Sequence, residues 1–131
     1  MTDMVMRDQS RAGHVLGGAR VADLPEQVSV RDVVRRRIRD EVASYNVDPG
    51  PVFRGLVQPA DAVRHSDGFR MRQPRPLDAE LLIAAAEAAV GLGLLRLRLD
   101  EQPVGLDEVI APADHDELVA VLERSVVASG S

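Results

Sequence analysis

Residues 19–38 read Ala-Arg-Val-Ala-Asp-Leu-Pro-Glu-Gln-Val-Ser-Val-Arg-Asp-Val-Val-Arg-Arg-Arg-Ile, and residues 94–99 read Leu-Leu-Arg-Leu-Arg-Leu. The first stretch has the pattern of a strand, a turn and a capped helix, because Ser29 precedes apolar residues at helical spacing. The second alternates leucine and arginine after its first residue, which is typical of a strand with one buried face. Together they predict a small sheet packed on one helix.

The composition is typical of one globular domain: 131 residues, of which 45% are hydrophobic and 28% charged. Because cysteine is absent, disulfides, thiolate catalysis and cysteine-ligated zinc are excluded. No apolar run is long enough to cross a bilayer, and residues 1–13 lack the apolar centre of a signal peptide, so we expect a cytoplasmic protein.

The domain boundaries follow from the same scan. We expect residues 1–13 to be a flexible N-terminal segment, although Met4 and Met6 could belong to a strand. Residues 14–126 are predicted to form a single α+β domain, and residues 127–131 a flexible tail. Within the domain, Gly17-Gly18 predicts the turn of a hairpin.

The charge pattern narrows the class of partner. The formal net charge is −5, so the molecule as a whole should not attract polyanions. All 16 basic residues are arginine, which is typical of proteins from GC-rich bacteria and gives any basic surface the planar, bidentate chemistry of guanidinium. The few aromatic side chains offer little stacking surface for single-stranded nucleic acid.

The middle of the chain predicts further elements. Residues 52–57 are short, apolar and strand-like. Residues 62–72 predict a hairpin that turns at Asp67-Gly68. Residues 79–92 predict a second helix, which Asp78 caps and alanine favours.

The bracketing segments resemble the ubiquitin-like β-grasp superfamily, in which a β-hairpin precedes the main helix and later strands return to the same sheet. Residues 28–38 are similar to the entry into that helix. Residues 95–110 are similar to the third strand, the short strand after it and the following turn. Residues 118–122 then fall where the last strand lies, which favours a strand there over a helix capped by Asp114.

The resemblance implies an α+β fold: a β-grasp-like mixed sheet packed on one main helix, with an inserted hairpin and second helix. It covers about half of the chain. Conjugated modifiers and sulfur carriers of the superfamily end in Gly-Gly, whereas this sequence ends Val-Ala-Ser-Gly-Ser. We therefore expect a binding scaffold rather than a modifier. Residues 53–59 also resemble small uncharacterised proteins of GC-rich bacteria, which implies no function.

Catalytic and metal-binding patterns are weak. His14, His65 and His115 lie in separate segments, and none has a second histidine three or four residues away. Residues 114–117, Asp-His-Asp-Glu, offer nitrogen and oxygen ligands but are equally typical of a solvated loop. With lysine absent, no phosphate-binding loop of the Gly-x-x-x-x-Gly-Lys type exists. We predict no cofactor and no metal, and a small enzyme using Asp and His side chains is the least favoured hypothesis.

Arginine supplies the candidate binding residues, in two clusters. They are Arg35, Arg36 and Arg39 on the first helix, beside Arg37, and Arg64, Arg70, Arg72 and Arg75 around the hairpin. Either cluster could bind an acidic protein surface or nucleic-acid phosphates, or could pair with carboxylates of its own chain. We predict a non-catalytic intracellular protein that binds another protein through a sheet edge or through the hairpin, with nucleic-acid binding as the alternative.

Overall fold

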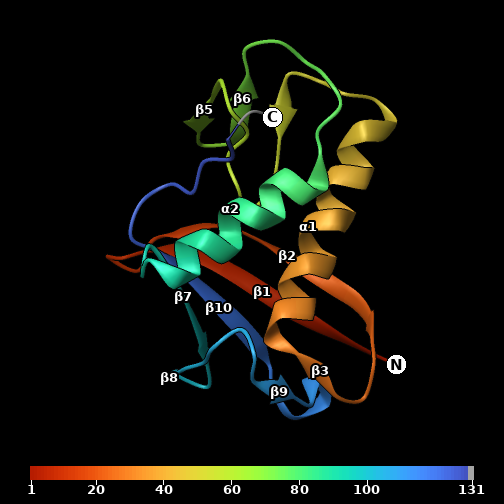
Figure 1. Cartoon of the computed structure of the whole chain (residues 1–131), viewed down its shortest axis with the longest axis vertical. Coiled ribbons are helices and arrows are strands. Elements are labelled where there is room, and N and C mark those ends of the chain that lie inside the picture. Colours follow the sequence, from red (N-terminus) through yellow and green to blue (C-terminus); the bar gives the residue numbers. More distant parts are fainter. Residues whose placement is uncertain (130–131) are drawn as a thin grey trace.

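The computed structural model describes residues 1–129 and shows an α+β fold (Figure 1). The strands are β1 (Thr2–Ser10), β2 (Val15–Leu24), β3 (Val28–Ser29), β4 (Val52–Phe53), β5 (Ala62–His65), β6 (Gly68–Met71), β7 (Leu95–Leu99), β8 (Gln102–Pro103), β9 (Val109–Ile110) and β10 (Glu117–Leu122). The helices are α1 (Val30–Val47), α2 (Ala79–Gly91) and a short 3-10 turn, η1 (Pro112–Asp114).

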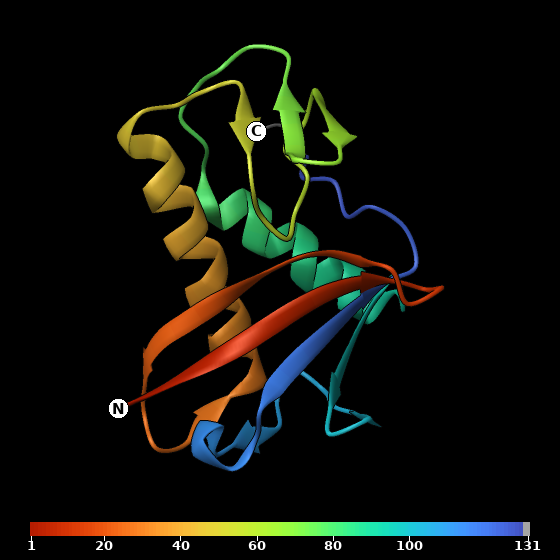
Figure 2. The ribbon, with the colours of Figure 1, turned by 180° about the vertical axis from the view of Figure 1, so that it is seen from behind.

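The main sheet has five strands in the order β2-β1-β10-β7-β8. β1 and β10 run parallel, and the other neighbours are antiparallel. The helices α1 and α2 lie on one face of this sheet, and no helix of residues 1–129 covers the other face (Figure 2). The mixed sheet packed on a main helix confirms the predicted fold class, and the hairpin before α1 is β1–β2.

The central helix and strand form for the reasons that the sequence indicates. The Ser29 hydroxyl accepts a hydrogen bond from the Asp32 amide over 3.1 Å, which caps α1. The face of α1 toward the sheet is aliphatic: Val30, Val33, Val34, Ile38 and Val42. In β7 the leucines are buried and the two arginines are exposed, as the alternation predicts. The strand predicted near residue 117 is β10.

The segment between α1 and β7 forms a small second sheet, β4-β6-β5, followed by α2. The hairpin β5–β6 turns at Asp67-Gly68 as predicted, and Gly68 has a φ of 136°. Phe53 and Phe69 are each 1% exposed, so these aromatic rings are core and cannot anchor a partner. Only Val52 and Phe53 of the expected strand pair as a strand.

The structure differs from the sequence analysis at the N-terminus. Residues 1–13 are not a flexible segment, because β1 lies inside the sheet with β2 on one side and β10 on the other. Met4 and Met6 are almost fully buried. The hairpin turns at residues 11–14, where the Gly13 amide donates to the Ser10 carbonyl over 2.9 Å. The pair Gly17-Gly18 lies within β2 instead.

The expected flexible tail, residues 127–131, also needs correction where the structure describes it. The Ala128 side chain is 2% exposed, and its amide donates to the Gln58 carbonyl over 2.9 Å. The Gln58 amide in turn donates to the Val126 carbonyl over 2.7 Å. The domain therefore includes residues on both sides of the predicted 14–126 boundaries, while residues 130–131 lie outside the described part of the chain.

Candidate partner-binding groove

Each arginine of the predicted cluster on α1 forms an ion pair with a carboxylate of the same chain. Its members form these pairs, at 2.6 to 3.2 Å: Arg35 with Glu87, Arg36 with Asp40, and Arg39 with Glu80. Two of these carboxylates belong to α2, so the pairs join the two helices. The Arg35 guanidinium, with help from Arg31, holds the pKa of Glu87 below its usual value. This cluster serves packing between the helices rather than a free basic surface.

Arg37, the neighbour of that cluster, is buried beneath it. Its Nη1 and Nη2 atoms donate to the two carboxylate oxygens of Asp8 over 2.5 and 2.6 Å, and its Nε atom donates to Glu41 over 3.2 Å. Glu41 also accepts the Leu56 amide over 3.3 Å. Burial raises the pKa of Glu41 above its ordinary value. The cluster of Asp8, Arg37 and Glu41 thus ties β1, α1 and the loop after β4 together.

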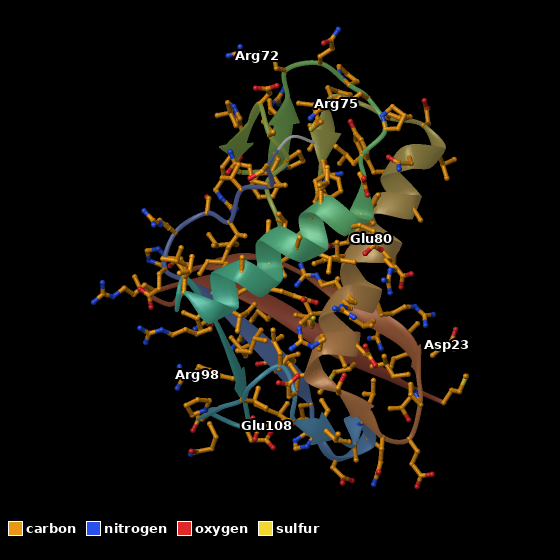
Figure 3. The ribbon with its side chains drawn as sticks, in the orientation of Figure 1. Asp23, Arg72, Arg75, Glu80, Arg98 and Glu108 are labelled. Atoms are coloured by element: carbon orange, nitrogen blue, oxygen red, sulfur yellow. The ribbon has the colours of Figure 1, made fainter. Side chains whose placement is uncertain are left out.

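The hairpin arginines differ in what they contact. The Arg64 guanidinium lies 4.5 Å from the centre of the Phe69 ring, and its Nε atom donates to Ser125 over 3.3 Å. Burial lowers the pKa of Arg64. Arg72 and Arg75 lie toward the end of the molecule far from the main sheet (Figure 3). The structure therefore does not bring the predicted hairpin residues to one point.

A groove runs along β2. One hollow of about 460 Å³ lies between β2, α1 and β4, and its lining includes Ala19 and Tyr45. A second hollow of about 250 Å³ lies deeper, under the β5–β6 hairpin. The two share Gly18, Arg37 and Arg54 in their linings, so we treat them as one feature, the β2 groove.

The groove lies beside an open sheet edge. Among the described strands, β2 pairs only with β1 and is the end strand of the five-stranded sheet. Val15 and Leu16 are 66% and 38% exposed. The opposite end strand, β8, has only two residues. The ten-residue β2 therefore presents the longest open edge of the main sheet.

Other hollows and side-chain clusters give weaker support for a binding site. A hollow of about 590 Å³ lies beside β7, where Arg11 and Arg96 both pair with Glu123. His115 contacts Asp100 over 2.5 Å. Within residues 1–129, no group of three or more His, Asp or Glu side chains is arranged to hold a metal ion. In the same part of the chain, no helix combines the length and apolar character needed to cross a membrane.

One sequence signal for the groove lies in β1 and was not among the predictions. Residues Met4, Met6 and Asp8 alternate in β1, so Asp8 falls on the buried face, where a carboxylate needs a partner. Arg37 is that partner, on the buried face of α1. Arg54 gave no signal, because its position depends on the fold of the inserted segment.

Comparison with known proteins gave no match to a family model, to a curated protein or to a solved structure. Membership of the β-grasp superfamily therefore remains a prediction. The function of the β2 groove is proposed below from the chemistry of its residues.

Proposed function

We propose that this protein is a non-catalytic binding module that pairs the open edge of β2 with an extended segment of another protein. One observation carries the proposal. The open edge and the β5–β6 hairpin line a single groove, so the two contact modes expected from the sequence, sheet edge and hairpin, belong to one surface.

Backbone hydrogen bonding supplies the affinity in such a contact. An unpaired strand edge carries a row of N–H and C=O groups that an added strand can satisfy. The β2 edge has few of the common protections against this: it contains no proline, its only charged residues are Arg20 and Asp23, and its register with β1 shifts only near its two ends. Ten residues are enough for a stable ladder, whereas the two residues of β8 are not.

Side chains of the groove supply the selectivity. In the β1–β2 register, Ala19 lies opposite the buried Met6, so it faces α1 and the groove. An added strand would direct every second side chain into the same space, next to Ala19, Tyr45 and Phe53. This end of the groove therefore favours an aliphatic side chain in the partner segment.

The test is affinity capture from the native host, followed by amide hydrogen exchange on the purified complex. We expect protection of the amides of residues 15–24 in the complex. The Ala19→Arg variant, which fills the groove, should lose the captured protein. Arg98→Ala, on β7 and outside the β2 groove, should retain it, provided that both variants keep the native spectrum.

A double variant separates the two contact modes. Arg70→Ala/Arg72→Ala removes two exposed charges of the hairpin and leaves β2 unchanged. Capture that survives this change but fails with Ala19→Arg supports the edge. Capture that fails only with the hairpin variant would refute edge pairing and place the contact on the hairpin.

A further inference from the structure

The deeper hollow of the β2 groove has a floor made by a residue without a side chain. Gly17 lies directly opposite Asp8 in the β1–β2 register. A Cβ atom at Gly17 would lie 3.5 Å from the Asp8 Oδ2 atom. The missing side chain therefore leaves open space above the Asp8–Arg37 pair, and this space is part of the pocket of about 250 Å³.

Two positive charges of the pocket lack a matching negative charge. Asp8 is bound at both oxygens by Arg37, and Asp67 pairs with Arg70 over 3.4 Å. Arg54 and Arg64 also line the pocket. Neither forms an ion pair with any carboxylate of residues 1–129. An anion placed between these two guanidinium groups would complete the balance of charge.

Arg64 is already held for such a role. The Phe69 ring beneath its guanidinium and the Ser125 hydroxyl beside its Nε atom fix its orientation. Partial burial lowers the pKa of Arg64, because the group has lost part of its solvent and the nearby Asp8 carboxylate offsets only part of this loss. Neither Nη atom is needed for these two contacts, so both can donate into the pocket.

We propose that this pocket binds a phosphate group carried by a small molecule. Arg54 and Arg64 donate to the phosphate oxygens, which guanidinium matches in a bidentate manner, and the nearby Ser66 hydroxyl offers a further donor. The volume suits a phosphate with a small substituent, because pockets for drug-sized ligands start at roughly 300 Å³. Asp8 does not oppose the ligand strongly, since both of its oxygens are bound by Arg37, and burial raises the pKa of Glu41, the second carboxylate on that arginine.

The test uses inorganic phosphate and the intact chain. Nitrogen-15 labelling of arginine lets the Nε–H signals be followed as phosphate is added at pH 7 and constant ionic strength. We expect saturable shifts of the Arg54 and Arg64 signals, and at least tenfold weaker binding of acetate, which carries less charge and fewer acceptor oxygens. Arg54→Gln and Arg64→Gln should each weaken phosphate binding at least tenfold.

Two further variants keep the result interpretable. Arg72→Gln makes the same charge change in the same hairpin but outside the pocket, so it should alter binding less than twofold. Gly17→Val fills the pocket without changing charge and should abolish binding in a chain whose amide spectrum stays native. The proposal fails if phosphate shifts do not saturate, if acetate binds equally well, if Arg72→Gln matches Arg64→Gln, or if Gly17→Val still binds.

The phosphate site is a separate proposal from partner binding, and either proposal can be disproved without the other. Arg54→Gln leaves the β2 backbone edge untouched, so loss of phosphate binding with retained capture would leave edge pairing standing. Loss of capture with retained phosphate binding would do the reverse.

Discussion

Arg37 is the bulkiest of the side chains that the core encloses fully, with 2% of its surface exposed. Burial of this charge is possible only because the guanidinium N–H groups donate to the carboxylates of Asp8 and Glu41. A buried ion pair of this kind contributes little net stability, since each group loses its hydration on folding. Removing one partner is a different matter, because it leaves the other charge buried and unpaired.

Arg37→Met should therefore lower the free energy of unfolding by about 3–5 kcal/mol, measured by urea denaturation at pH 7. The matched control is Arg36→Met, one residue along α1. Arg36 is 43% exposed in its side chain and, within residues 1–129, pairs only with Asp40, so its loss should cost less than about 1 kcal/mol. Adding Asp8→Leu to Arg37→Met should recover part of the lost stability, because it removes one of the two carboxylates left without Arg37, and a further loss would contradict this account.

Glu41 gives the same cluster a pH dependence. Because burial raises its pKa in the folded chain above the ordinary 4.5, the native state binds more protons than the unfolded state between the two values. Stability should therefore decrease as pH rises from 4.5 through the folded-state pKa of Glu41. Urea unfolding across this range should show the decrease in the wild type and a smaller one in Glu41→Gln. An unchanged slope in the variant would assign the effect to other groups.

At the scale of elements, the contact between α1 and α2 depends on Glu87, whose pKa is lowered in the folded chain, whereas that of Glu41 is raised. Glu87 of α2 receives Arg31 and Arg35 of α1 over 3.0 and 2.6 Å. These arginines lower its pKa, so its contribution is present above 4.5 and is lost as pH falls through the folded-state pKa. Glu87→Gln should cost about 1 kcal/mol at pH 7, by urea denaturation, and progressively less in acid.

The control for this prediction lies on the same helix. Glu80 pairs with Arg39 of α1, but both side chains are more than half exposed, at 68% and 52%. Glu80→Gln should therefore change stability by less than half of the effect of Glu87→Gln. Equal effects would mean that the degree of burial does not set the strength of these pairs.

Elements with a local signal could be predicted from the sequence, and elements defined by distant pairing could not. The Ser29 cap, the aliphatic stripe of α1 and the alternation of β7 are each contained in a short stretch. The strand β1 depends on β10 from the far end of the chain, and nothing within residues 2–10 reveals that partner. Gly17-Gly18 misled for a related reason: two glycines predict a turn, whereas here they remain in a strand beside a pocket.

The same distinction between local signals and distant contacts applies to the candidate site. The hairpin and its arginines were predictable, because Asp67-Gly68 is a local turn signal. Their different surroundings were not, since Arg64 contacts Phe69 and Ser125 while Arg72 remains exposed. Ser125 follows β10 and Arg64 lies in β5, so only the folded chain brings them together.

At the scale of the whole molecule, the inserted segment and the main sheet share one hydrophobic core. The segment that follows β10 fastens them together through the backbone of Gln58 and the buried Val126 and Ala128. Deleting residues 126–131 should therefore lower the thermal midpoint by several degrees, because it removes two backbone hydrogen bonds and two buried side chains.

Calorimetry checks this prediction, with deletion of residues 130–131 alone as the control. The short deletion leaves both Gln58 hydrogen bonds in place, so its thermal midpoint should stay within about one degree of the wild type, well below the shift that a loss of 1 kcal/mol produces. A chain lacking residues 126–131 that melts at the wild-type temperature would show that this segment does not fasten the insert.

The position of β10 between β1 and β7 has a consequence for how the protein is made. Each flanking hairpin can form early, but the sheet stays in two halves until the strand that joins them has been synthesised. During translation the aliphatic faces of both halves stay incompletely packed until residues 117–122 have been added. A ribosome that stalls before Glu117 would hold a nascent chain that chaperones can recognise as unfinished.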